Sequence, residues 1–113
     1  MKIKTKDLIG QALDYAVARA MGKRPSMFIY QQDGDLAKQH RYSRDWSQGG
    51  PIIERAVVSL GVEEGGWRAL CWGMDGPNRE LYSMRGPTPL IAAMRCYVAS
   101  KMGDEVDVPE ELL

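Results

Sequence analysis

The sequence predicts an α+β fold in which a small antiparallel β-sheet is flanked by three α-helices. Three segments carry apolar residues on one face at helical spacing, at residues 5–22, 51–60 and 88–102. Two β-type runs, at residues 67–72 and 80–84, enclose a turn rich in Gly and Pro, which is typical of a hairpin. Helices with one apolar face need a common surface to pack against, and a small sheet supplies that surface.

Length, composition and charge narrow the classes of protein. The chain has 113 residues, of which 44% are hydrophobic, so we expect one globular domain over residues 1–113. The 15 Lys and Arg residues balance the 15 Asp and Glu residues, which makes overall attraction to nucleic acid or to a membrane surface weak. Because the chain opens without a signal peptide and its apolar runs are short, we expect a cytoplasmic protein with no membrane partner.

End signals define the first and third helices. Thr5 or Asp7 can cap the start of the first helix, and Gly22 stands where a left-handed stop is favoured. Thr88 is expected to cap the third helix, with Pro89 as its first residue. Both helices therefore have a predicted beginning that depends only on neighbouring residues.

Three further features are interpreted from composition alone. Residues 27–30 form a short apolar run, which we interpret as a strand followed by a polar loop to residue 41. The acidic tail at residues 104–109 is expected to be extended. Asp14 is expected to face solvent on the first helix, and the alternative is a site carboxylate that a cationic group needs.

The stretch at residues 42–54 combines aromatic, charged and amide side chains with a glycine pair. Ser43 is a good N-cap, and Asp45 would lie in the first turn, where the positive end of a helix favours a carboxylate. Gly49-Gly50 is expected to break this turn, and Pro51 is well placed to begin a new helix that runs to residue 60. The stretch is thus predicted to be a junction between a short turn and the second helix.

The sequence offers no catalytic or metal-binding constellation. His40 is the only histidine and lies in a predicted polar loop with no identifiable catalytic partner, so no convincing Ser-His-Asp triad can be built, and zinc-site spacing is absent. Cys71 and Cys96 lie among apolar neighbours, which favours buried structural thiols in both cases. No phosphate-binding or dinucleotide-binding glycine motif is present. We therefore predict a protein that is not an enzyme and that needs no metal and no cofactor.

Aromatic and polar residues near the second helix are the candidate binding site. Stacking on aromatic rings and hydrogen bonds to polar edges would suit a planar polar ligand such as a nucleotide, and free backbone N–H groups at the glycine pair would suit an anion. The alternative is that the tryptophans pack in the core. The candidate ligand-binding residues are Tyr42, Arg44, Asp45, Trp46, Gln48, Gly49, Gly50 and Arg95.

Four blocks of residues carry a family resemblance. They are Leu13–Ala18 with Met21-Gly22, Tyr42–Trp46, Gly49–Glu54, and Gly86–Arg95 with the exit at Gly103-Asp104. In these blocks the chain resembles the NinX-like family of small proteins from lambdoid phages and prophages, and it is similar to the broader phage ABA sandwich domain. The resemblance implies a phage origin and a sheet with helices on both sides. It implies no enzyme class and transfers no catalytic residue.

These observations lead to a functional hypothesis. We expect a phage or prophage accessory protein, in the cytoplasm of the bacterial host, that binds a small nucleotide-like ligand or a host factor without catalysis. A homodimeric interaction module that modulates a host protein is the alternative. Direct DNA binding is less favoured, because only the basic residues near the start of the chain support it.

Overall fold

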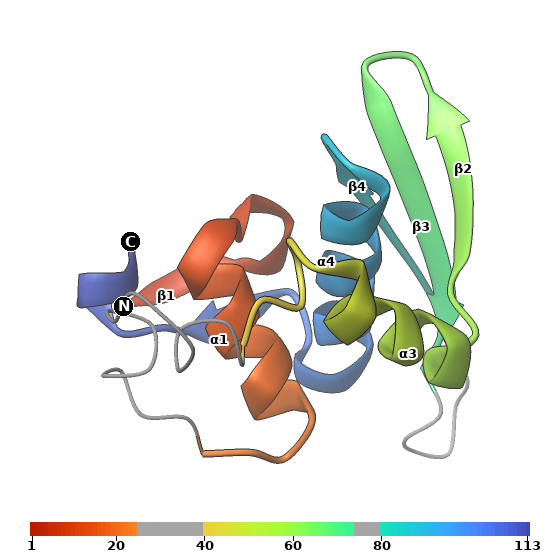
Figure 1. Ribbon diagram of the computed structural model, residues 1–113. Coiled ribbons are helices and arrows are strands. Elements are labelled where there is room, and N and C mark those ends of the chain that lie inside the picture. Colours follow the sequence, from red (N-terminus) through yellow and green to blue (C-terminus); the bar gives the residue numbers. More distant parts are fainter. Residues whose placement is uncertain (25–39, 74–79) are drawn as a thin grey trace.

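A computed structural model describes residues 1–24, 40–73 and 80–113, and it confirms the α+β class with three α-helices and antiparallel sheets (Figure 1). The elements in chain order are β1 (Lys2–Lys4), a 3-10 turn η1 (Thr5–Asp7), α1 (Gly10–Ala20), α3 (Trp46–Ala56), β2 (Ser59–Glu63), β3 (Gly66–Trp72), β4 (Leu81–Gly86), α4 (Pro89–Met102), β5 (Glu105–Asp107) and a second 3-10 turn η3 (Glu110–Leu112). The predicted strand at residues 27–30 and most of the predicted hairpin turn lie outside the described residues.

The predicted hairpin is confirmed as β3 and β4, and β2 adds a third strand. The antiparallel order is β2-β3-β4, with Cys71 opposite Tyr82. Helix α4 lies along one face of this sheet (Figure 1), where the small residues Ala69 and Cys71 pack against it. A Cβ atom at Gly86 would collide with the backbone of Ala92, so this glycine permits the close approach of helix and strand. The second helical layer that the family resemblance implies stays a prediction.

The two ends of the chain pair with each other in a second sheet. β1 and β5 are antiparallel, with Ile3 opposite Val106. The N-terminal ammonium donates to Asp107 at 2.9 Å. The predicted extended tail is confirmed, but its partner strand was not predicted, because the pairing joins segments about a hundred residues apart in the chain.

Helix α1 begins later than the sequence predicts, and its capping prediction is wrong. The helix starts at Gly10, which has a φ of +61° and follows the extended residues Leu8 and Ile9, and the N-cap Ile9 contributes no side-chain hydrogen bond. Thr5 does not cap α1, because its hydroxyl donates to the Gly103 carbonyl at 2.6 Å. The tertiary contact with the C-terminal segment therefore replaces the local cap.

Helix α3 is continuous, so the predicted break at the glycine pair is wrong. It runs from Trp46 to Ala56 through Gly49, Gly50 and Pro51. Asp45, not Ser43, is the N-cap, and its carboxylate accepts a hydrogen bond from the Ser47 backbone N–H at 2.9 Å. Pro51 thus lies inside the helix, where its lack of an N–H leaves one helical hydrogen bond unmade.

The end of α3 also differs from the prediction. The helix ends at Ala56, and Val57 takes a left-handed conformation with a φ of +52°. Leu60 and Gly61 belong to β2 rather than to the helix. Leu60 packs against the core from a strand, and its spacing from the preceding apolar residues also fits a helix. Periodicity alone could not separate these two states.

Helix α4 is confirmed with its predicted start. The Thr88 hydroxyl accepts the Ile91 backbone N–H at 3.1 Å, and Pro89 is the first helical residue. The core lies between α1, α3 and α4 and extends to β5. Its buried apolar residues include Leu8, Leu13, Val17, Tyr42, Ile52, Leu90, Met94, Val98, Val106 and Val108.

Candidate functional site

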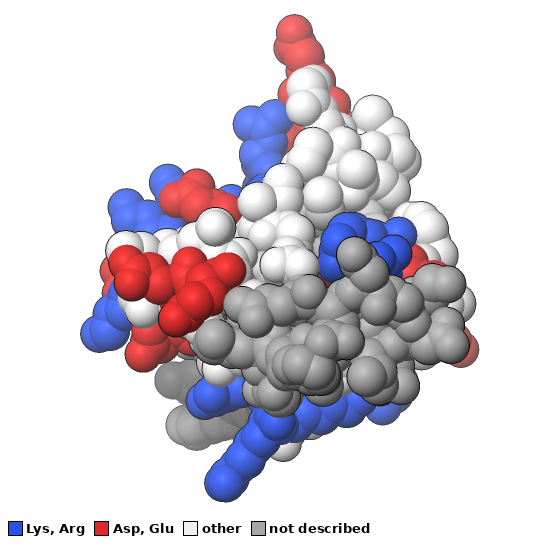
Figure 2. All heavy atoms as spheres, turned by 60° about the vertical axis from the view of Figure 1, so that its left-hand side comes forward, with Lys and Arg blue, Asp and Glu red and all other residues white. Residues whose placement is uncertain are grey.

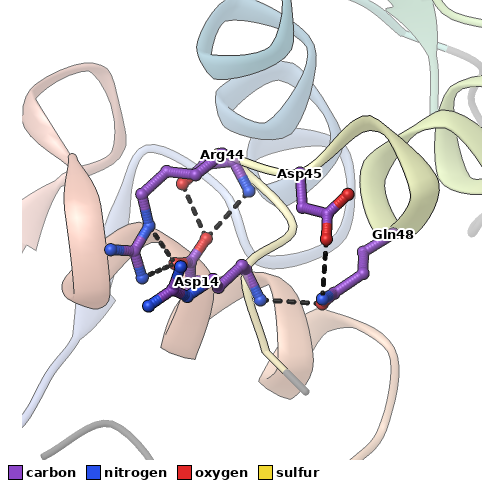
Figure 3. Close-up of polar contacts among 6 residues, drawn as sticks. Asp14, Arg44, Asp45 and Gln48 are labelled. Carbon is purple, nitrogen blue, oxygen red and sulfur yellow. Dashed lines mark hydrogen bonds and ion pairs between the residues drawn. The ribbon is translucent and has the colours of Figure 1, made fainter. Parts of the chain in front are cut away.

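Asp14 joins α1 to the segment before α3, and its predicted exposure is wrong. The residue is completely buried, within a run of buried residues from Ala12 to Ala18. Its carboxylate accepts hydrogen bonds from the Ser43 N–H at 2.8 Å and from the Ser43 hydroxyl at 2.6 Å. The Arg44 guanidinium donates to the other oxygen at 3.2 and 2.8 Å (Figure 3). The predicted solvent exposure is therefore wrong, and the cationic partner of Asp14 is Arg44 of the same chain.

A second polar group holds the start of α3. Asp45 accepts from the Ser47 hydroxyl at 2.7 Å. It also accepts from the Gln48 amide at 3.3 Å (Figure 3). The Gln48 side-chain oxygen in turn accepts the Arg41 backbone N–H at 2.7 Å. The hydrogen bonds from Ser47 are the main reason that the pKa of Asp45 lies below its ordinary value, and those from Gln48 and the charge of Arg41 act in the same direction.

The other candidate ligand-binding residues between positions 42 and 50 do not join these two polar groups. Tyr42 is buried, with its hydroxyl 3.1 Å from both Lys23 Nζ and His40 Nδ1. Trp46 is 53% exposed. The Gly49 N–H donates to the Asp45 carbonyl at 2.9 Å, so the prediction that it is a free donor at a helix start is wrong. Gly50 is half-buried inside the same helix.

Arg95 makes its hydrogen bonds at a different place. Its guanidinium donates to the Leu8 carbonyl at 2.8 Å and to the Arg85 carbonyl at 2.9 Å. These bonds join α4 to the segment before α1 and to β4. The structure therefore brings Arg44, Asp45 and Gln48 together near Asp14. Arg95 instead donates to backbone carbonyls of β4 and of the segment before α1.

A cavity of about 260 Å³ opens between the end of α1, the second half of α3, the end of β3 and the last turns of α4. Its lining contains two aromatic side chains, two cationic side chains and no acidic side chain. The lining residues are Met21, Ile52, Arg55, Ala56, Trp72, Tyr97, Ser100 and Lys101. The combination suits a small ligand that is flat at one end and negatively charged at the other.

Sequence reasoning missed most of this cavity. None of its aromatic and cationic residues was among the candidate ligand-binding residues; they are Arg55, Trp72, Tyr97 and Lys101. Their side chains come from elements that are far apart in the chain and that meet only in the fold. The sequence did show one basic residue beside the apolar face of α3 and one beside the apolar face of α4. This pattern is too common in helices to identify a binding site.

The two cysteines are buried, as predicted, and Cys71 interacts with Ser100, which lines this cavity. Their sulfur atoms are 3.2 Å apart, and both residues are free thiols. The hydrogen bond from Cys96 lowers the pKa of Cys71, and the hydroxyl of Ser100 adds to this effect. The pKa of Cys96 is raised, first by its interaction with Cys71 and second by burial.

The described part of the chain holds no metal-site cluster and no membrane-spanning helix. No three His, Cys, Asp or Glu side chains gather there as a metal site would require. No described helix has the length and apolar character needed to cross a bilayer. On the described surface visible in Figure 2, small basic and acidic groups alternate without forming one continuous basic face.

Comparison with known proteins identifies one family. A family model with the description "Bacteriophage P22, NinX" matches residues 4–101. This range includes every residue that lines the cavity and the whole of the Asp14 and Asp45 contacts. No curated protein matches the chain.

Proposed function

This chain belongs to the bacteriophage P22 NinX family, and we propose that it is a phage accessory protein that binds a small planar anion, such as a mononucleotide, in the host cytoplasm without catalysis. The observation that carries the proposal is the cavity in which Trp72 and Tyr97 stand with Arg55 and Lys101. Aromatic side chains and cationic side chains in one cavity are the two features that a base and a phosphate need.

The aromatic side chains supply the surface for a base. Trp72 is 54% exposed at the end of β3, and Tyr97 is half-buried on α4. Stacking of a base on an aromatic ring contributes about 1–3 kcal/mol and tolerates different bases. The proposed pocket therefore favours a flat ring without requiring one particular nucleobase.

The cationic side chains supply the partners for a phosphate. Arg55 and Lys101 are both exposed at the cavity, and Ser100 adds a hydroxyl group. A guanidinium can donate two parallel hydrogen bonds to one phosphate, whereas a lysine acts as a point charge. The absence of acidic residues from the lining means that no carboxylate there opposes an anion.

The size of the cavity limits the ligand. Its volume of about 260 Å³ is slightly below the usual range of roughly 300–1,000 Å³ for small-molecule sites. The pocket therefore suits a mononucleotide better than a dinucleotide or an oligonucleotide.

In this proposal the polar contacts before α3 act by positioning. The Asp14–Arg44 pair and the Asp45 cap fix the start of α3. The same helix carries Ile52 and Arg55 to the cavity. These contacts would then influence ligand binding without touching the ligand.

Thermal melting with a ligand panel tests this function. Nucleoside monophosphates should raise the Tm more than the corresponding nucleosides or inorganic phosphate do, because only they offer both a base to the aromatic side chains and a phosphate to the cations. Isothermal titration should give one site per chain. If no nucleotide in the panel changes the Tm, the proposed function is wrong.

Contact with a host protein through Trp46 is the second candidate function. A large side chain that is 53% exposed beside the anchored Asp45 resembles the aromatic anchors of protein interfaces. Trp46→Ala should then abolish capture of the host partner and leave mononucleotide binding unchanged. The homodimer alternative is tested by light scattering, where a mass near 12.6 kDa would exclude it.

A further inference from the structure

Cys71 and Cys96 approach each other from two different layers of the fold. Cys71 lies on β3 and Cys96 on α4, and both are at most 2% exposed. Their sulfur atoms are 3.2 Å apart. A disulfide needs a sulfur–sulfur distance of about 2.04 Å, so the two sulfur atoms, and with them β3 and α4, must approach each other to form one.

The pair is linked directly to the proposed ligand cavity. Cys71 is followed by Trp72, which lines the cavity from the sheet side. Ser100 lies four residues after Cys96, lines the cavity from the α4 side and interacts with the Cys71 thiol. A covalent bond between the two sulfurs would therefore join the two walls of the cavity.

We propose that Cys71 and Cys96 form a reversible disulfide that staples β3 to α4 and regulates ligand binding in the cavity that Trp72 and Ser100 line. The regulatory part rests on the proposed function, whereas formation of the bond does not. Because both sulfurs are buried, only a small oxidant can reach them. We assign hydrogen peroxide as this oxidant.

The oxidation proceeds in two balanced steps. The Cys71 thiolate attacks one oxygen of the peroxide, the O–O bond breaks, and Cys71 becomes a sulfenic acid while the released hydroxide takes up the Cys71 proton as water. The Cys96 sulfur then attacks Cys71 Sγ, and the S–O bond breaks. The departing hydroxide takes the Cys96 proton as a second water. Two thiols are thereby oxidised to one disulfide, and one peroxide is reduced to two waters.

The lowered pKa of Cys71 agrees with its role as the attacking thiol. Its neighbours Cys96 and Ser100 both favour the thiolate through hydrogen bonds. The raised pKa of Cys96 agrees with the second role, in which a thiol responds only after its neighbour has been oxidised.

The bond is expected to weaken ligand binding. Formation of the disulfide pulls the β3 wall with Trp72 toward the α4 wall with Ser100. The cavity is already at the small end for a ligand site, so further narrowing excludes part of the ligand. The oxidised protein should therefore bind a mononucleotide several-fold more weakly than the reduced protein.

Mass spectrometry and melting of the full chain test the bond. After exposure to hydrogen peroxide, the intact mass should fall by two hydrogens, and peptide mapping without reductant should recover the Cys71 peptide joined to the Cys96 peptide. The Tm should rise on the order of 10 °C and should return to its starting value with dithiothreitol. Cys96→Ala should show neither the cross-link nor the rise, and Cys71→Ser serves as a second variant.

The outcomes separate the two parts of the inference. Two thiols that remain available for alkylation in the unfolded chain after oxidation, or a sulfinic acid without a cross-link, would overturn the disulfide. Equal mononucleotide affinity in the reduced and oxidised forms would overturn the regulation. If neither form binds a mononucleotide, the proposed function fails together with its regulation, and the mass measurement still decides the bond.

Discussion

Asp14 lies completely buried in α1 and accepts two hydrogen bonds from Arg44, which stands thirty residues later in the chain. Ser43 satisfies the other oxygen of the carboxylate with its N–H and its hydroxyl. A buried charge is tolerated only when such partners surround it. This contact attaches the segment before α3 to the core, and it leads to the first of four predictions.

Asp14→Ala should destabilise the fold by about 3 kcal/mol, because it leaves the buried Ser43 donors without a partner and removes an ion pair. The Arg44 side chain is 42% exposed, so its share of this loss is reduced by solvent. Urea unfolding measures the change. Asp107→Ala, which removes an exposed ion pair with the N-terminus, is the control and should have a much smaller effect. Equal losses in the two variants would contradict a structural role for Asp14.

Adjacent glycines in α3 should respond in opposite directions to alanine. A Cβ at Gly49 would collide with the Tyr42 carbonyl and the Leu90 side chain, whereas a Cβ at Gly50 would meet open space. We expect Gly49→Ala to cost about 2 kcal/mol or more. Gly50→Ala should be neutral or stabilising by up to about 1 kcal/mol, because alanine favours a helix more than glycine does. Thermal and urea unfolding of both variants measure the two changes. A Gly49→Ala protein as stable as the wild type would show that Gly49 does not lie close to Tyr42 and Leu90.

Removal of either cation at the cavity should weaken mononucleotide binding. Arg55→Ala and Lys101→Ala are each expected to raise Kd by about tenfold, since a hydrogen bond to a charged group contributes roughly 1.5–3 kcal/mol. Titration calorimetry at fixed salt is the measurement. Lys2→Ala removes an exposed cation at the end of the chain and should leave Kd unchanged. An equal rise in Kd in all three variants would indicate that the overall charge of the protein, and not a specific site, controls binding.

Stability should fall as the pH is lowered below the ordinary pKa of histidine. Burial is the main cause of the lowered pKa of His40, the charge of Lys23 adds to it, and the charge of Asp14 opposes it. The folded state therefore favours neutral His40. The stability that neutral His40 adds to the folded state is fully present above the unfolded pKa of 6.5. This stability is lost as the pH falls through the pKa of His40 in the folded state.

Melting curves between pH 7.5 and pH 5.5 measure this dependence. His40→Gln should flatten the profile in that interval, because it removes the only histidine. A profile that is identical in both proteins would assign the dependence to other groups.

The candidate site was predicted only in part. Residues 42–48 were identified by their unusual density of polar and aromatic side chains, and the structure does gather Arg44, Asp45 and Gln48 into hydrogen-bonded groups. Asp14, the partner of Ser43 and Arg44, was expected to face solvent, because a carboxylate in an amphipathic helix is usually exposed. It also could not assemble the cavity, whose walls come from α1, α3, β3 and α4.

The sequence by itself determined the α+β class, the β3–β4 hairpin and the start of α4 at Thr88 and Pro89. These features depend on periodicity and capping within a few residues, so neighbouring positions contain the whole signal. Only the tertiary structure decided the burial of Asp14, the continuity of α3 through Gly49, the end of that helix at Val57 and the pairing of β1 with β5. Each of these depends on contacts between distant segments, whose packing outweighs the local preference of the chain.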